Sequence, residues 1–327
     1  MEVAQITYRL FDKKDLPGIL SLWENFSGWG AITSEQFTQW YIDTPSGSCL
    51  IVVAADETDT VLGQIVLVPA QVILNGQVLK AVRLSAPILH PELRQVDLRS
   101  RSHPVIMMVM KSVEFATEKG YHILYSLPAH AWIGALKILQ REGMWDLQMA
   151  AYECRSISLM DETIWSICSG NNLITRHVRH FNTSYDELFA EATRQFPISL
   201  CIVRNAERLQ WKISHHIVIE IRNEQGLMGY AAYKKNGLLV DILARTKDDL
   251  QLVFTASLKA LHVQNDHRVK APFDEIKFMM NEPVRNLLEG LNHQPANFQF
   301  AIASYPLQKS IDKHALAPEQ WYMMPDD

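Results

Sequence analysis

The chain has 327 residues, of which 48% are hydrophobic and 20% are charged, and its net charge is −5. This composition is ordinary for a globular protein, and the length is sufficient for two domains. The sequence contains no long basic run, and its net charge does not indicate a nucleic-acid surface. A local basic patch is not excluded by the net charge. The N-terminus lacks the apolar core of a signal peptide and no later segment is as long as a membrane span. We therefore expect a cytoplasmic protein with no membrane or nucleic-acid partner.

The residue pattern does not favour metal or disulfide chemistry. The chain has four cysteines, Cys49, Cys154, Cys168 and Cys201. They are far apart and form no CxxC pair, so neither a zinc site nor a disulfide framework is predicted. His177 and His180 have a helical i, i+3 spacing, but no acidic or thiol residue accompanies them. We predict no metal site.

The first ninety or so residues alternate between helical and extended patterns. We expect, in chain order, a strand at 5–11, a helix from Asp15, a helix from Thr33 or Ser34, and strands at 49–55, 61–74 and 77–89. The last two strands meet at Asn75-Gly76, and Asn-Gly between apolar runs is the strongest short-range signal of a β-hairpin. The pattern therefore predicts antiparallel strands before residue 90.

A basic loop and the start of a helix follow these strands. The loop carries three arginines, Arg94, Arg99 and Arg101. Ser102 is the expected N-cap, Pro104 suits the first helical turn, and Gly120 ends the helix. Free amides at a helix N-terminus beside arginines would stabilise a phosphate or pyrophosphate, although a solvated basic loop would contain the same residues.

The first half ends with a strand, a helix and a strand. Residues 122–129 read as a strand that follows a helix, so we expect it to lie parallel to an earlier strand. A helix is expected at 131–142, ended by Gly143, and a last strand at 145–158.

This order of elements resembles the GNAT-type acyltransferases, which bind acyl-coenzyme A (acyl-CoA). Local similarities are the His90-Pro91 pair, the AxxxG pattern at 116–120 and Gly143. The resemblance implies a mostly antiparallel sheet flanked by helices, in an α+β fold. It also implies that the pantetheine arm enters a gap between the fourth and fifth strands, and that the pyrophosphate rests on the loop before the long helix.

The second half looks like a diverged copy of the first. Glu35 and Trp40 are echoed by Glu207 and Trp211, and a second Asn-Gly turn occurs at 236–237. Such tandem duplications resemble bacterial two-copy members of the superfamily, with a tail such as 321–322 that crosses back. We therefore expect two GNAT-like domains, at 1–158 and 159–327, with a linker at about 159–182.

The resemblance assigns roles to residues of the first copy. The residues expected to bind acetyl-CoA or another acyl-CoA are Ile88, Leu89, His90, Arg94, Arg99, Arg101, Ser102, His103 and Ser126. Amides near residues 88–90 would polarise the thioester. Glu24 and Trp29 lie on the first helices, where the acceptor amine approaches in this fold.

The sequence departs from the family pattern at two places. The pyrophosphate loop of the family has two glycines, and the matching positions are Ser102 and Pro104. The tyrosine that protonates the leaving thiolate is replaced by Leu139. His130, at the start of the same helix, is the alternative proton donor.

Two functions remain open from the sequence. One is an acyl-CoA-dependent N-acyltransferase that binds the cosubstrate in the first copy and transfers the acyl group to a small-molecule or peptide amine by direct attack. The other is a binding or scaffold protein in which this fold survives without catalysis. The second copy is the poorer cofactor site, because Asp248 and Asp249 at its long helix would repel phosphate.

Overall fold

The structure is a computed structural model, and it shows two compact units. The described residues are 6–95, 102–128, 130–141, 146–161, 164, 173–195, 199–267, 273–285, 287 and 290–327. The first unit comprises Met1–Val72, Val78–Met149 and Ile302–Pro318, and the second comprises Ile73–Gln77, Ala150–Ala301 and Glu319–Asp327. Among the helices of the described residues, none combines the length and the apolar character that a membrane span requires.

The first unit is built on one sheet with the strand order β1-β2-β3-β4-β5-β13. Its strands are β1 (Thr7–Leu10), β2 (Leu50–Ala55), β3 (Val61–Leu74), β4 (Gln77–Leu89), β5 (Ile123–Ser126) and the end of β13 (Gln294–Pro306). β1, β2 and β3 pair antiparallel, whereas β4 and β5 are parallel. The predicted strands 61–74 and 77–89 and the parallel fifth strand are confirmed.

The turn between β3 and β4 is the predicted Asn-Gly hairpin. Asn75 has φ 49° and Gly76 has φ 81°, and two successive left-handed residues make the tight turn whose twist matches that of the strands. Asparagine and glycine are the residues that tolerate this backbone best.

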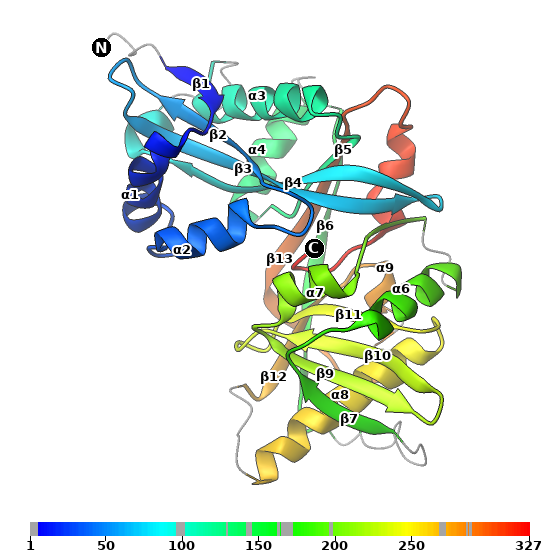
Figure 1. The fold of residues 1–327 in the computed structure, drawn as a ribbon. Helices are drawn as coiled ribbons and strands as arrows, with labels where there is room; N and C mark the ends of the chain where they lie inside the picture. Colours follow the sequence, from blue (N-terminus) through cyan, green and yellow to red (C-terminus); the bar gives the residue numbers. More distant parts are fainter. Residues whose placement is uncertain are drawn as a thin grey trace. The chain divides into compact units, whose positions relative to one another are not determined.

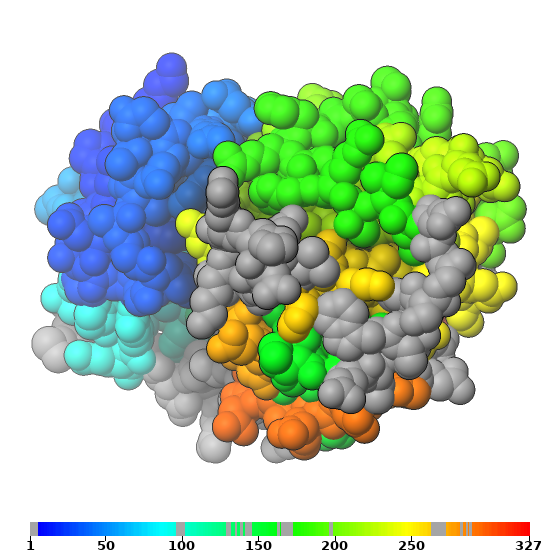
Figure 2. All heavy atoms as spheres, turned by 90° about the horizontal axis from the view of Figure 1, so that it is seen from below, coloured from blue at the N-terminus to red at the C-terminus, as the bar shows by residue number. Residues whose placement is uncertain are grey.

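Helices cover both faces of the first sheet (Figure 1). On one face lie α1 (Leu16–Phe26), α2 (Ser34–Phe37) and the π-helical turn η2 (Thr38–Ile42) that continues α2. On the other face lie α3 (Pro104–Glu118) and α4 (His130–Arg141). On the face seen in Figure 2, the segment with α1 and α2 (blue) forms much of the visible part of this unit.

The N-cap of α3 differs from the prediction by one residue. His103 occupies the cap, and its Nδ1 accepts a hydrogen bond of 3.2 Å from the amide of Val105. The reason is that Pro104 is the first helical residue, so the cap position falls on its predecessor and not on Ser102.

The second unit repeats this plan. Four strands, β7 (Ile174–Val178), β9 (Ile217–Asn223), β10 (Gly226–Tyr233) and β11 (Leu239–Ala244), form an antiparallel sheet. The other strands are β6 (Gln148–Ser158), β8 (Leu200–Ile202), β12 (Glu275–Met279), β14 (Trp321–Tyr322) and the start of β13. The helices are α6 (Thr183–Gln195), α7 (Ala206–Ile213), α8 (Asp249–His267) and α9 (Glu282–Arg285).

The two units do not follow the predicted boundary at residue 158. β6, expected as the last strand of the first domain, pairs with β12 in the second unit, and the end of β13 pairs with β5 in the first. Each half of the sequence thus supplies a strand to the other unit. The expected linker at 159–182 also contains β7. Periodicity identifies a strand but not its partner, so this exchange was not visible in the sequence.

Candidate functional site

The site is a pocket in the first unit, at the point where β4 and β5 separate. The two strands pair in parallel from residues 81 to 84 and 123 to 126. Beyond Leu84 and Ser126, residues 85–87 of β4 and residues 127–128 after β5 line the pocket. Its volume is about 370 Å³. The opening predicted between the fourth and fifth strands therefore exists in the described part of the first unit.

A β-bulge at Ala86 creates the opening on the β4 side. Ala86 has φ 46°, an uncommon left-handed backbone for a non-glycine residue. Val82 and Leu84 pack on the α3 face, whereas Ala86 and Ile88 pack on the α1–α2 face. In a regular strand these four even-numbered residues would all face the same side of the sheet. The change of side between residues 84 and 86 therefore indicates an extra residue in the strand, which is a β-bulge. Pro87 adds to the opening because it has no amide hydrogen for a ladder bond.

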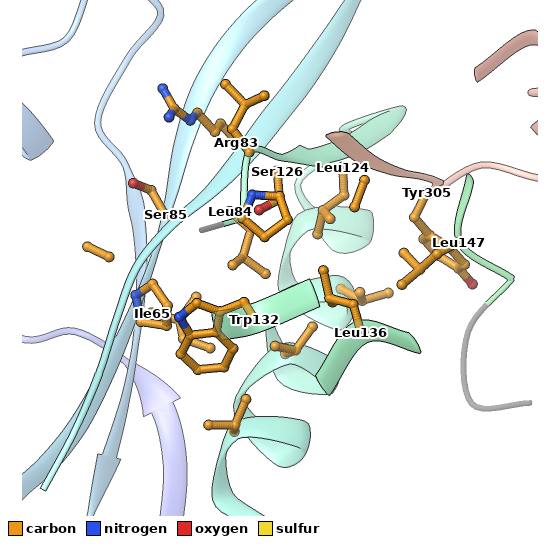
Figure 3. Close-up of a pocket in the computed structure, with 18 of the residues that line it drawn as sticks. Ile65, Arg83, Leu84, Ser85, Leu124, Ser126, Trp132, Leu136, Leu147 and Tyr305 are labelled. Atoms are coloured by element: carbon orange, nitrogen blue, oxygen red, sulfur yellow. The ribbon is translucent and has the colours of Figure 1, made fainter. Parts of the chain in front are cut away.

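The α3 and α4 side of the pocket is apolar. The residues that form this wall are Ile65, Leu84, Val105, Ile106, Val109, Val113, Leu124, Trp132, Leu136 and Leu147. Figure 3 shows Leu84 directed toward Trp132 of α4. Such a wall suits a flexible apolar chain and offers little to a charged group.

The α1–α2 side is aromatic and carries Arg83 and Ser85, whereas Tyr305 belongs to the α3 side, where it packs against the cluster of Val82 and Ala116. Trp23, Trp29 and Tyr41 line it, and the Trp23 ring centroid lies 5.6 Å from that of Trp29 and 6.4 Å from that of Tyr41. Trp29 is 61% exposed at the rim. Arg83 and Ser85 point to the side of β4 opposite Leu84 (Figure 3). The pocket therefore passes through the sheet, with different chemistry on its two faces.

Tyr41 remains protonated at neutral pH. Burial raises the pKa of its hydroxyl, Cys49 raises it further, and the positive charge of Arg83 opposes the rise. The influence of Arg83 on the pKa of Tyr41 agrees with their position on one face of the sheet. Tyr41 is accordingly a hydrogen-bonding group in this pocket and not a base.

One wall of the pocket comes from the far end of the chain. Ala303 and Tyr305 of β13 line it, and they pair with Ser126 and Leu124 of β5. No local pattern in the first 158 residues indicates this contribution. Sequence reasoning missed Tyr305 because its contact with the site depends on the exchanged strand.

Two of the predicted site residues line the pocket. Ser126 lies where β5 leaves β4, and Trp29 lies at the aromatic rim. Glu24 is exposed and is not among the described residues that line the pocket. Residues 85–87, three positions before the predicted 88–90, contribute the β4 edge. The shift arises from the bulge, which ends the β4–β5 register early.

The predicted residues 88–90 lie at the end of β4, which ends at Leu89, and their contacts are packing contacts. Ile88 and Leu89 are buried in two different apolar clusters. The amide of His90 donates to the carbonyl of Leu62 at 2.7 Å, and its ring lies 4.8 Å from the Phe26 ring. These contacts hold the strand end to β3 and α1.

The remaining predicted residues surround the start of α3. Arg94 donates from Nε to the carbonyl of Leu89 at 3.0 Å and from Nη2 to that of Phe26 at 2.9 Å, so it links the loop to β4 and α1. His103 is the buried cap of α3, and Ser102 is exposed. Arg99, Arg101 and the side chain of His130 lie outside the described residues.

Arg83, Ser85 and Tyr305 line the pocket but were not assigned to the site from the sequence. The sequence did contain a signal for Arg83 and Ser85. These two polar residues alternate with the apolar residues Val82, Leu84 and Ala86 in one strand, and this pattern places both on the same face of the sheet.

Comparison with known proteins gives the fold class. No family model and no curated protein matches the sequence. The structure of a GCN5-related N-acetyltransferase from Anabaena variabilis is similar at a TM-score of 0.66 and 12% identity, over 93% of this chain and 73% of that one. A tandem GNAT protein of the clavulanic acid biosynthesis pathway is similar at a TM-score of 0.55 and 12% identity, over 94% of this chain and 100% of that one.

A third similar structure contains an acyl-CoA. N-myristoyltransferase from Saccharomyces cerevisiae, with bound myristoyl-CoA, matches at a TM-score of 0.56 and 10% identity, over 93% of this chain and 80% of that one. The chain therefore has a GNAT-type α+β fold of mostly antiparallel sheet flanked by helices. Its structural neighbours are N-acyltransferases.

Proposed function

We propose that this protein is an N-acyltransferase that uses an acyl-CoA and binds it in the first unit. The observation that carries the proposal is the pocket that passes through the sheet where β4 and β5 separate. A thioester in this opening would be reachable from both faces. The apolar face of α3 and α4 suits the pantetheine arm and the acyl chain, and the face with Arg83 and Ser85 suits a polar acceptor.

The fourth strand of the second unit, β11, carries a buried network of charged groups. Asp241 of β11 accepts hydrogen bonds of 2.9 Å from Arg204 and from Tyr230. Arg204, only 1% exposed, also pairs with Asp327. Removal of Arg204 would leave two buried carboxylates without their cation, so this network favours a structural role.

The reaction requires the amine to attack while neutral. Its lone pair forms a C–N bond to the thioester carbonyl carbon, the C–S bond breaks, and coenzyme A leaves as the thiol with the proton that the nitrogen loses. Backbone amides of Ser85 and Ala86 at the bulge are the proposed donors to the carbonyl oxygen as it gains charge. The pocket holds both reactants together, which removes much of the entropic barrier.

The proton donor to the thiolate stays a prediction. His130 is proposed for this role because it begins α4, whose residues Trp132 and Leu136 line the pocket. We expect a His130→Gln variant to lose at least tenfold in kcat while its KM for acyl-CoA stays within twofold. A Tyr305→Phe variant separates this role from that of the pocket hydroxyl on β13. Equal kcat for His130→Gln and the unmodified enzyme would remove His130 from the mechanism.

The test of the proposal is calorimetry of the full chain with acetyl-CoA and with octanoyl-CoA. We expect micromolar binding of at least one, weakened tenfold or more in an Arg99→Ala/Arg101→Ala variant. Arg176→Ala/Arg179→Ala, which removes two exposed arginines of the second unit, is the matched control. Absence of binding at millimolar concentration would contradict the proposal, and unchanged binding in the first variant would move the site elsewhere.

A scaffold protein is the second candidate. The observation in its favour is the start of α3, where Pro104 contributes no amide hydrogen and the family's two glycines are absent. Binding of acyl-CoA without release of coenzyme A toward any amine would favour this function.

A further inference from the structure

The electrostatics of the pocket point to the kind of acceptor. Arg83 is the only charged side chain among the described residues that line it, and no acidic side chain is among them. A substrate with a second positive charge, such as a polyamine, would find no anionic partner among these described residues. A substrate with a negative charge would find a guanidinium and no repelling carboxylate.

The position of Arg83 relates this charge to the reacting atoms. Arg83 and Ser85 share one face of β4, and residues two apart on a strand are separated by about 7 Å. Ser85 and Ala86 border the opening in which the thioester carbonyl would lie. An acceptor whose amine is in this opening can therefore reach Arg83 with a group only a few bonds away from its nitrogen.

The remaining wall on this side is aromatic. Trp23 is 6% exposed and Tyr41 is 7% exposed, and the Trp23 ring lies between that of Tyr41 and that of the more exposed Trp29, in contact with both. Flat, apolar surfaces of this kind favour an aromatic or large aliphatic group. The acceptor side thus combines one positive charge with an aromatic wall.

We propose that the acceptor is an amino acid or a closely related amino carboxylate with an aromatic or large apolar side chain, and that Arg83 binds its carboxylate. This inference rests on the proposed acyltransferase function. A guanidinium binds a carboxylate through two parallel N–H···O bonds, which fixes the orientation of the acceptor as well as its charge. Arg83 would be a specificity-determining residue, and the aromatic wall would select the side chain.

The test uses amines that differ only in a carboxylate. The pairs are L-phenylalanine with phenethylamine, L-tryptophan with tryptamine, and L-leucine with isoamylamine. Release of coenzyme A by the full chain is measured for each, with the acyl-CoA that binds best. We expect at least one carboxylated amine to exceed its partner tenfold or more in kcat/KM.

Three variants assign this preference to Arg83. Arg83→Met should reduce the ratio of kcat/KM between the carboxylated amine and its uncarboxylated partner to near one, mainly because kcat/KM for the carboxylated amine falls. Arg83→Lys keeps the charge without the two-pronged geometry, so we expect an intermediate ratio. Lys80→Met, a change of the same charge at an exposed position of β4 outside the pocket, should leave the ratio unchanged.

The outcomes separate this inference from the function on which it rests. If no acyl-CoA binds to the unmodified protein, both are overturned. If acyl-CoA binds but no pair shows a preference for the carboxylate, or no amine of the panel reacts, only the amino acid acceptor is overturned. A preference that survives in Arg83→Met, with acyl-CoA binding and thermal unfolding unchanged, overturns the role of Arg83.

Discussion

Asp15 is the buried end of an ion pair that joins β1 to the start of α1. Arg9 donates to its two carboxylate oxygens at 2.6 and 2.8 Å, and the amide of Asp12 donates at 2.7 Å. The carboxylate is 1% exposed. Burial by itself would raise the pKa of Asp15, but the hydrogen bonds from Arg9 and Asp12 lower it below 3.8 overall. The native state therefore stabilises the ionised form.

This pair predicts a particular pH dependence of stability. Because the pKa of Asp15 is lower in the folded state, its contribution is complete above about pH 4 and is lost as the pH falls through the folded pKa. We expect Asp15→Asn to reduce the free energy of unfolding by about 1–3 kcal/mol at pH 7. The difference from the unmodified protein should shrink below pH 4, as measured by urea unfolding.

The control for Asp15 is Asp59, which contacts the same arginine at 2.7 Å but is 49% exposed. Exposed ion pairs contribute about 0–1 kcal/mol, so Asp59→Asn should have a much smaller effect. A loss of equal size in both variants, or a loss for Asp15→Asn that is the same at pH 3 and pH 7, would contradict the burial argument.

At the scale of elements, the bulge of β4 decides where the pocket opens. Without it, residues 82, 84, 86 and 88 would share one face, and the β4–β5 register could continue past Ser126. The left-handed backbone of Ala86 is tolerable because its side chain is a single methyl group. The carbonyl of Ala86 also accepts a hydrogen bond of 3.3 Å from the buried side chain of Gln64.

Substitutions at Ala86 test this role of the bulge. A β-branched residue cannot easily adopt φ 46°, so Ala86→Val should lower the free energy of unfolding by about 1–3 kcal/mol. Ala86→Gly adopts this backbone freely and should remain within about 1 kcal/mol of the unmodified protein. The stabilities of the two variants are compared by thermal unfolding. Equal stability would contradict the argument, because it would mean that a β-branched residue is accommodated at this bulge without backbone strain.

Several elements could be predicted from the sequence because their signals are local. The Asn-Gly turn predicts where β3 ends and where β4 begins. The proline at residue 104 and the spacing of the apolar residues after it predict the helix that starts there. The bulge could not be predicted, because Ala86 is an ordinary strand residue and its positive φ depends on neighbouring strands. The same applies to the site, where Ser126 and Trp29 were predicted and the role of residues 85–87 was not.

At the scale of the whole molecule, the exchange of strands makes the two halves of the sequence interdependent. β5 is completed by the end of β13, and β12 is completed by β6. A fragment that ends at residue 158 would lack Ala303 and Tyr305 in its pocket and would leave one edge of β5 unpaired. Unpaired strand edges favour aggregation.

Fragments test this dependence. We expect residues 1–149 alone to show no cooperative unfolding transition by circular dichroism. The same residues joined by a flexible Gly-Ser linker to residues 302–318 should regain one, because the linker returns the missing strand to β5. Cooperative unfolding of residues 1–149 alone would show that the first unit does not need the exchanged strand.

Local signals were enough to predict most of the strands and helices in their order, the Asn-Gly turn at 75–76, the helix that starts at Pro104 and, from that order, the GNAT-type fold, whereas β7 and β8 were not predicted. Which strands pair, where β4 bends away from β5 and which side chains meet in the pocket depend on contacts between distant parts of the chain. These contacts do not follow from local patterns, because a strand's periodicity specifies a face and not a partner. Arg83 and Tyr305 are separated by more than two hundred residues, and they line one pocket only because β13 returns to β5.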